Sequence, residues 1–495
     1  MTTAAMQPKV PDAVECVEKI DSSFSEQGKE TKSTDPYYDE EYTRAEQRRI
    51  IHKVDRRLVV GLGLAMAIAL MDRTNLGSAA IAGMTVDLGL EHGPRYSLIL
   101  LVFFIPFVLS QLPAAVVIRK VGPRDFITLI TFCWGGVMMC FGFVHDWWVL
   151  IILRILIGIL EAGLLPACIL LLSCWYTRFD VHKRFSSFYL ISSVGSAIAP
   201  VLACGFMQMG GLSGLAAWRW IFIMEGLLTI AVAFINWFLL VDYPLDAHKC
   251  WKFLTKKEED YIIRRINRDR ADANADHKFN LRQFIRPGKD WRVWQYAIIY
   301  MCGTAVAYSL SFFLPIILRL KLGYDVTAAQ ALSTPPYVFA GIFMYVEAWL
   351  GDKYHIRGPI IIWNCLQSIC GLCLLGWVKA PGVQYFGIFL VASGVNGNVP
   401  ATLAWQANNV RGNWKRAFCS ALLIMGGGTG GVIGSLVFRS QDAPTYLPGI
   451  EASIVANVIS IICAVVMMLS LYASNKKAAA GRTVLEELPG FRYTL

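Results

Sequence analysis

The 495-residue sequence is 55% hydrophobic and only 17% charged, with a formal net charge of +10 at pH 7. This composition excludes a soluble enzyme of ordinary surface-to-volume ratio and predicts a multi-pass membrane protein. The positive charge does not indicate nucleic-acid binding, because the basic residues are concentrated in every second connection between apolar segments.

The N-terminal region, residues 1–50, is polar and lacks the apolar core of a secretory leader, so we expect a disordered cytosolic tail. A basic segment at residues 44–57 precedes the first apolar span, as is typical of the side that faces the anionic cytoplasmic leaflet. Six spans then form an N-terminal half, residues 51–241. We expect these spans at residues 58–81, 96–118, 126–143, 147–176, 185–209 and 218–240.

Residues 242–290 are too charged to enter a membrane and form the predicted central cytosolic loop. Within this loop, Thr255 and Glu258 have the spacing of a capping box, which predicts a short amphipathic helix ending at residue 270. A C-terminal half of six further spans occupies residues 291–473, and a cytosolic tail follows at residues 474–495. We expect the spans at residues 291–318, 328–350, 358–377, 383–407, 417–438 and 450–472.

Lys and Arg gather in alternate short loops, and such loops remain on the cytosolic side. The predicted fold is therefore an all-α membrane protein of twelve transmembrane helices in two six-helix halves, with both termini cytosolic. In this layout the substrate binds near the midplane between the halves, and access alternates as the halves rock.

The span at residues 147–176 carries two charges, Arg154 and Glu161, inside an apolar run. Each is costly in hydrocarbon, by at least ~2.5 kcal/mol, so each is expected to face a bundle interior, a partner or a water-filled cavity. Seven residues place them about 20° apart around the helix axis and roughly 10 Å apart along it. One interpretation is a structural ion-pair element, and the other is a site for an anionic substrate with a titratable carboxylate beside it.

The first span carries a polar patch that includes Asp72, Arg73 and Asn75, about 22 Å along the helix from Arg57. This level coincides with that of Arg154 in the antiparallel fourth span. Arg73 and Arg154 are therefore predicted to converge on one substrate carboxylate, because a guanidinium matches carboxylate geometry and stays charged in a dry site. Asn75 is a further substrate-binding candidate in the same patch. Asp72 either binds a proton or neutralises one of these arginines permanently.

Glu161 is the first candidate for the proton-coupling acid, since burial and a neighbouring cation shift a carboxyl pKa in opposite directions. The alternative is a neutral, hydrogen-bonded structural glutamate. Glu225 follows a Trp-Arg-Trp sequence in the sixth span and is interpreted as pairing with a helix end, outside the core site.

In the second half, aromatic and amide side chains suit the uncharged part of a ligand, which makes Tyr308, Asn396 and Asn398 further substrate-binding candidates. Two equivalent loops are the predicted gating hinges, and each contains basic residues. The hinge residues are Gly122 and Arg124 in one loop, and Asp352, Lys353 and Arg357 in the other. The glycine-rich run at residues 426–434 favours close helix contact, not nucleotide binding, because no strand precedes it.

The chain resembles the major facilitator superfamily, and within it the anion:cation symporters of the fungal allantoate permease-like branch. The resemblance covers residues 56–473. It is carried by Asp72-Arg-Thr-Asn-Leu-Gly-Ser-Ala79, Arg154 with Glu161-Ala-Gly-Leu-Leu-Pro166, Leu172-Ser-Cys-Trp-Tyr176, Trp218-Arg-Trp-Ile-Phe-Ile-Met-Glu-Gly226, and Trp405 with Asn408, Lys415 and Arg416. Arg73 is similar to the basic residue in the first span of vesicular glutamate transporters. One departure is Arg119, which stands where the superfamily usually has an aspartate.

The resemblance implies a secondary transporter, not an enzyme, that imports a small organic anion together with protons. Nicotinate, pantothenate and allantoate represent the implied substrate class. The alternatives are an exporter of an acidic metabolite and a nutrient sensor that does not transport. We expect no cofactor, no metal and no nucleic acid, with the substrate, protons and the lipid bilayer as partners of a monomer in the plasma membrane.

Overall fold

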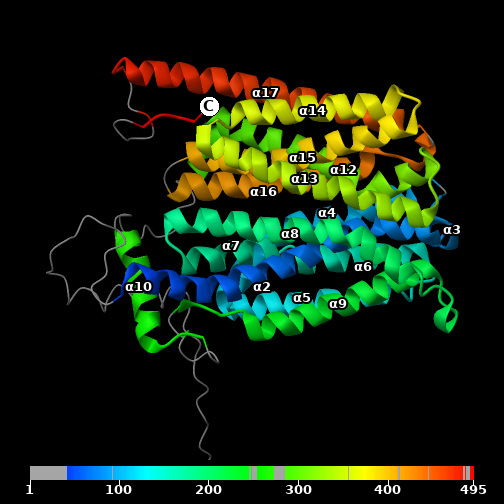
Figure 1. The fold of residues 1–495 in the computed structure, drawn as a ribbon, viewed down its shortest axis with the longest axis horizontal. Coiled ribbons are helices and arrows are strands. Elements are labelled where there is room, and N and C mark those ends of the chain that lie inside the picture. Colours follow the sequence, from blue (N-terminus) through cyan, green and yellow to red (C-terminus); the bar gives the residue numbers. More distant parts are fainter. Residues whose placement is uncertain are drawn as a thin grey trace, which may run out of the picture.

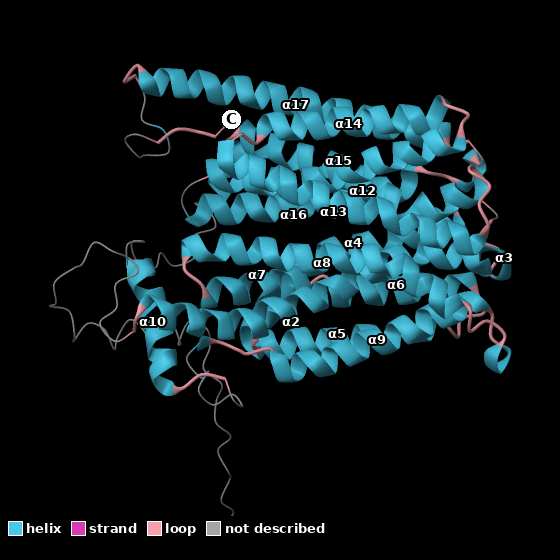
Figure 2. Cartoon of the chain, in the orientation of Figure 1, coloured by secondary structure: helices cyan, strands magenta, loops and turns pink. Residues whose placement is uncertain are grey.

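The computed structural model describes residues 42–494, with gaps at 92, 245–246, 248–252, 272–284, 355, 411–412, 444, 483–484 and 486–490. Residues 1–41 of the predicted disordered tail, residues 1–50, lie outside this description. Residues 44–50 are not disordered but form the first turns of a helix that Thr43 and Glu46 cap. The described residues are helical, with short connections and no strand (Figure 2). The N-terminal half contains α2 (Arg44–Ala79), the π-helical turn η1 (Ala80–Met84), α3 (Thr85–Asp87), α4 (Arg95–Val121), α5 (Pro123–Phe141), α6 (Trp147–Glu161), α7 (Leu164–Trp175), α8 (Arg178–Met207) and α9 (Ala217–Leu239).

The C-terminal half packs beside the first as a second bundle (Figure 1). Helix α10 lies at one end of the N-terminal bundle and α3 at the other, and we call these the α10 end and the α3 end. The remaining helices are α10 (Lys256–Ala271), α12 (Trp291–Leu320), α13 (Val326–Tyr354), α14 (Gly358–Trp377), α15 (Pro381–Asn409), α16 (Asn413–Val437) and α17 (Leu447–Ala479).

The predicted spans agree with the helices in order and approximate bounds, with one exception. The fourth span was predicted as one helix, but it divides into α6 and α7 at Ala162 and Gly163. A side chain at Gly163 would lie 2.6 Å from the Phe126 ring, so glycine allows α5 to pack against the break. Nine helices in the described part are long and apolar enough to cross a membrane, while the count of twelve stays a prediction.

The glycine-rich run of α16 lies in a close contact between the halves. A Cβ atom at Gly428 would lie 2.2 Å from Val108 of α4, and one at Gly431 would lie 2.1 Å from Phe104. On its other face, Gly430 would meet the Met301 carbonyl of α12 at 2.5 Å. The predicted helix contact through small residues is therefore confirmed, because only glycine permits this approach on both faces.

Hydrogen bonds join the two halves at the α3 end. They link α4, η1 and α2 of the first half to α12, α13 and the residue that follows α16 in the second. The contacts are the Tyr96 hydroxyl to the Phe312 carbonyl at 3.4 Å, the Ser97 hydroxyl to the Phe438 carbonyl at 3.5 Å, the Gln330 amide to the Ser78 carbonyl at 3.0 Å, and the Arg319 guanidinium to the Ile81 carbonyl.

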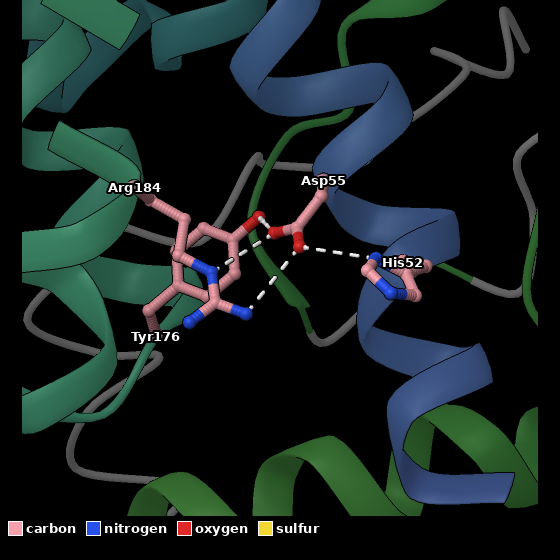
Figure 3. Close-up of polar contacts among 4 residues, drawn as sticks. All are labelled: His52, Asp55, Tyr176 and Arg184. Atoms are coloured by element: carbon pink, nitrogen blue, oxygen red, sulfur yellow. Dashed lines mark hydrogen bonds and ion pairs between the residues drawn. The ribbon is translucent and has the colours of Figure 1, made fainter. Parts of the chain in front are cut away.

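At the α10 end, Asp55 of α2 ties together three segments of the first half (Figure 3). Its carboxylate accepts a hydrogen bond from the Tyr176 hydroxyl at 2.6 Å and from Arg184 Nε of α8 at 3.1 Å. Nearby, Lys53 pairs with Glu258 of α10 at 2.6 Å. The predicted capping box is also confirmed, since the backbone N–H of Thr255 donates to the Glu258 carboxylate at 2.9 Å.

The C-terminal segment docks on the second half. The Thr494 carbonyl accepts hydrogen bonds at 2.9 Å from Trp405 Nε1 and from the Asn409 amide, both on α15. The neighbouring residue Tyr493 exchanges two hydrogen bonds of 2.8 Å with Asn475 of α17. The segment therefore links α15 to α17 at their α10 ends.

Removing the chain from Phe491 onward is expected to lower the melting temperature by several degrees, because each of these lost hydrogen bonds contributes about 1 kcal/mol. Thermal unfolding of purified protein in detergent measures the change. Arg482→Ala, at an exposed position before the segment, is the control and should leave the melting temperature unchanged. An unchanged melting temperature in the shortened chain would show that docking contributes nothing to stability.

Candidate functional site

Consecutive polar residues of α2 are buried and face different helices. Asp72 accepts a hydrogen bond from Trp134 Nε1 of α5, Arg73 bonds to Glu161 of α6, and Asn75 donates to Glu225 of α9. This divergence follows from helix geometry, since successive side chains point about 100° apart. The polar patch therefore forms the centre of a buried network inside the first half.

Arg73 connects the two halves. Its Nε donates to Glu161 Oε1 at 2.7 Å, and its Nη1 donates to the Tyr308 hydroxyl of α12 at 2.6 Å. Its guanidinium carbon lies 5.6 Å from the centre of the Phe103 ring and 5.0 Å from that of Phe107. A cation is thus held by one carboxylate, one hydroxyl and aromatic faces from α4.

Arg154 is only 4% exposed, and its Nε and Nη2 have no hydrogen-bond partner among the described residues. Its guanidinium lies 5.2 Å from the centre of the Phe141 ring and interacts electrostatically with Asp72 and Glu161. Buried guanidinium groups normally have their donors satisfied, because an unmet donor costs free energy. These two nitrogens are suited to receive an anion.

The two carboxylates beside the arginines each have one oxygen without a partner. Glu161 Oε1 accepts from Arg73 while Oε2 is buried and unbonded, and Asp72 Oδ1 is likewise unbonded. When Asp72, Arg73, Arg154 and Glu161 are all ionised, their charges sum to zero. A proton on Glu161 would leave the cluster positive, which favours an anion.

The structure brings Arg73, Arg154, Asp72, Glu161 and Tyr308 together. Of the other predicted residues, Asn75 borders this cluster, because it also hydrogen-bonds Asp72, while Asn396 and Asn398 have partners elsewhere. Asn75 donates to Glu225, the Asn396 amide donates to the Ala392 carbonyl of its own helix at 2.8 Å, and the Asn398 amide donates to Cys365 Sγ at 3.2 Å.

Sequence reasoning missed two members of the network. Glu225 is fully buried beside Asn75 and does not pair with a helix end, and Trp134 binds Asp72. An acid inside an apolar span, at residues 217–239, was the available signal for Glu225. No sequence signal distinguished Trp134 from other aromatic residues in the core.

The predicted gating residues form two local structures at the α10 end. Gly122 has φ of 95°, a left-handed conformation that favours glycine, and Arg124 Nη2 donates to the Trp237 carbonyl at 2.8 Å. In the other loop, the Lys353 ammonium lies 4.8 Å from the centre of the Trp349 ring, and Arg357 is buried. The side chain of Asp352 lies outside the described residues.

Asp242, just after α9, places an acid beside the turn at Gly122, which follows the end of α4, where Arg119 stands in place of the usual aspartate. Its carboxylate accepts backbone hydrogen bonds from Arg124 and Tyr243. A Cβ atom at Gly122 would lie 2.8 Å from Asp242 Oδ2, so the glycine makes room for this carboxylate. Burial raises the pKa of Asp242 to about 6, and the charge of Asp125 acts in the same direction.

This raised pKa predicts a pH dependence of stability. The pKa is near 3.8 in the unfolded chain and about 6 in the folded one, so the folded state holds the proton more tightly. The contribution of Asp242 to the free energy of unfolding should be greatest below pH 4 and should be lost as the pH rises to about 6. The melting temperature of Asp242→Asn should rise relative to that of the wild type as the pH increases from 4 to 7. A constant difference would contradict the assignment.

Comparison with known proteins places this geometry in a family. Residues 62–435 match the profile of the Major Facilitator Superfamily. The chain is 31% identical over 454 residues to the MFS-type transporter cnsO of Penicillium expansum, covering 90% of this chain and 87% of that protein. It is 26% identical to the high-affinity nicotinic acid transporter of Saccharomyces cerevisiae, covering 88% of this chain and 80% of that protein.

Solved structures share the fold at low sequence identity. A bacterial homologue of the human lysosomal transporter Spinster, in an inward-facing and unoccupied conformation, aligns with a TM-score of 0.63 at 14% identity. That alignment covers 87% of this chain and 98% of the bacterial chain. A D-xylose–proton symporter aligns with a TM-score of 0.62, also at 14% identity, covering 84% of this chain and 97% of that one.

Proposed function

The chain belongs to the Major Facilitator Superfamily, and we propose that it is a proton-coupled symporter that imports a small organic anion. It is a multi-pass membrane transporter, not an enzyme. The proposal of anion symport rests mainly on Arg154, a buried cation with unbonded donors beside the Arg73–Glu161 pair. We place the protein in the plasma membrane.

Competition for Arg73 supplies the coupling in this proposal. Glu161 occupies Arg73 while the glutamate is ionised, at a hydrogen-bond distance of 2.7 Å. A proton on Glu161 weakens this pairing and leaves Arg73 and Arg154 free to bind a carboxylate. Because the cluster then carries net positive charge, the proton and the anion each favour binding of the other, which is the linkage that symport requires.

The substrate proposed is a compact carboxylate, such as a carboxylate vitamin or a nitrogen-containing acid. The guanidinium of Arg73 accounts for the carboxylate. The stacked rings of Phe103 and Phe107, whose centres lie 5.5 Å apart, offer an apolar surface beside it. The nicotinic acid transporter among the relatives supports this class.

Tyr308 links occupancy of the site to the arrangement of the halves. Its hydroxyl binds Arg73 across the interface, and further hydrogen bonds join the halves at the α3 end. If the α10 end is cytosolic, as the loop charges indicate, this arrangement is closed to the outside. Rocking of the halves about this contact would then expose Arg73 and Arg154 to each side in turn.

Uptake of matched acid and amide pairs tests the proposal. Nicotinate and nicotinamide differ mainly by one charge, so purified protein in liposomes should import the acid at least about tenfold faster, since loss of a charged contact costs more than 1.4 kcal/mol. An acidic exterior should accelerate import of the acid. Equal import of acid and amide across such pairs would contradict anion recognition, and import indifferent to the pH gradient would contradict symport.

A further inference from the structure

A further buried acid lies in the C-terminal half, far along the chain from the proposed anion site. Glu347 of α13 is 7% exposed, and its Oε2 accepts a hydrogen bond from the Asn364 amide of α14 at 3.0 Å. Its Oε1 is buried without a hydrogen-bond partner among the described residues. Only one of the two carboxylate oxygens therefore has a hydrogen-bond partner in the described structure.

The neighbouring helices are shaped around this pair. A Cβ atom at Gly397 of α15 would lie 2.3 Å from Glu347 Oε2 and 2.8 Å from the Asn364 amide nitrogen, so any larger residue would displace them. Asn364 is fully buried, and its own Oδ1 also lacks a hydrogen-bond partner in the described structure. Two unbonded buried oxygens therefore occur where α13, α14 and α15 meet.

No described basic side chain forms an ion pair with Glu347. Helices α14 and α15 contain no charged residue, and the Asp352 side chain lies outside the description. The titratable groups on these two helices are Cys365, Cys370, Cys373 and Tyr385. The described basic groups on the neighbouring segments have other contacts: Lys353 with Trp349, Arg357 beside Gly351, Arg184 with Asp55, Arg292 with Ser470, and Arg319 with the Ile81 carbonyl. The side chains of Arg178 and Lys183 on α8 lie outside the described residues.

An ionised carboxylate in a membrane interior is costly without a compensating positive charge. Asn364 can serve both charge states, which an arginine could not. Its N–H donates to the ionised carboxylate, and after a 180° rotation of the amide its oxygen accepts from the protonated acid at the same distance. The pair is therefore suited to gain and lose a proton without rearranging the helices.

We propose that Glu347, with Asn364 as its partner, is a second proton-binding site used in each transport cycle. The inference rests on the proposed symport and extends it to the stoichiometry. One proton on Glu161 balances a monocarboxylate, and a second proton on Glu347 gives each cycle one net positive charge. Glu347 has its own partner and does not contact the anion site. For this stoichiometry it is protonated when the loaded transporter changes arrangement and ionised when the empty transporter returns.

Nicotinate uptake into proteoliposomes under a potassium diffusion potential tests this stoichiometry. At equal pH inside and outside, an inside-negative potential from a tenfold potassium gradient with valinomycin should raise wild-type accumulation about tenfold, as expected for one net charge. Glu347→Gln keeps a hydrogen bond to Asn364 and should abolish this response while retaining uptake driven by a pH gradient. Glu347→Asp keeps an acid and should retain the response.

Glu451→Gln removes an exposed acid of α17 and serves as the matched control, with the wild-type response expected. Wild-type uptake driven by the pH gradient but unaffected by potential would overturn the Glu347 proposal alone, as would a potential response that persists in Glu347→Gln. Sodium-dependent uptake that Glu347→Gln abolishes would replace the proton by a metal cation and also overturn it. Wild-type uptake indifferent to any pH gradient would instead refute the proposed symport.

Discussion

Replacing Arg154 by alanine is expected to reduce uptake by at least about 100-fold, because the lost charged contact is worth roughly 3 kcal/mol or more to a bound carboxylate. Its Nε and Nη2 make no hydrogen bond in the described structure, so the substitution breaks few internal contacts. The amount of protein in the membrane should therefore stay close to that of the wild type. Uptake normalised to the amount of reconstituted protein measures the effect.

Arg154→Lys is the matched variant, since it keeps the charge and loses the planar guanidinium. We expect intermediate activity, with weaker apparent affinity for the anion. Normal uptake in Arg154→Ala would remove Arg154 from the site and leave its unbonded nitrogens without a function. Loss of folded protein in both variants would indicate a structural ion-pair element instead.

Replacing Glu161 by glutamine is expected to leave exchange of substrate across the membrane within a few-fold of the wild type and to abolish accumulation. Glutamine Oε1 can still accept the hydrogen bond from Arg73, so the local structure should persist. Without an ionisable group, anion binding no longer requires a proton, and a pH gradient cannot drive uptake. Counterflow and gradient-driven uptake, measured on the same liposomes, separate the two activities.

Thr131→Val provides a control for a polar substitution elsewhere in the first half, since its hydroxyl donates only to the Ile127 carbonyl of its own helix. It should retain both exchange and accumulation. If Glu161→Gln accumulated substrate as the wild type does, Glu161 would be a structural hydrogen-bonding residue. Asp72, which also has an unbonded oxygen, would then be the next candidate for coupling.

The sequence was sufficient to predict the order and approximate bounds of the helices, because apolar runs separated by charged loops are a strong signal. It did not predict the break at Ala162 and Gly163, since the hydrophobic run continues through it. The docking of Tyr493 and Thr494 was also missed. Those contacts join residues that are far apart in the chain, and no local sequence pattern predicts them.

For the site, buried charge was an informative signal, and hydrogen-bonding partners were not predictable. Charges inside apolar spans are costly and therefore indicate a partner or a function. This signal identified Arg73, Arg154 and Glu161. That Asn75 faces Glu225, and not the arginines, depends on the rotation of α2 against its neighbours. Asp242, which follows the last helix of the first half, accepts a backbone hydrogen bond from Arg124 in the segment after Arg119. Such a compensation appears only after folding.

Proton movement linked to substrate entry tests most directly the claim that a proton on Glu161 allows the anion to bind Arg73 and Arg154. The measurement is the internal pH of proteoliposomes, followed with a trapped dye when nicotinate, or another carboxylate that the uptake assay selects, is added outside. Wild-type protein should acidify the interior as labelled substrate enters, and Glu161→Gln should exchange substrate with little acidification. Substrate entry through the wild type without any pH change, or equal acidification by the variant, would contradict the account.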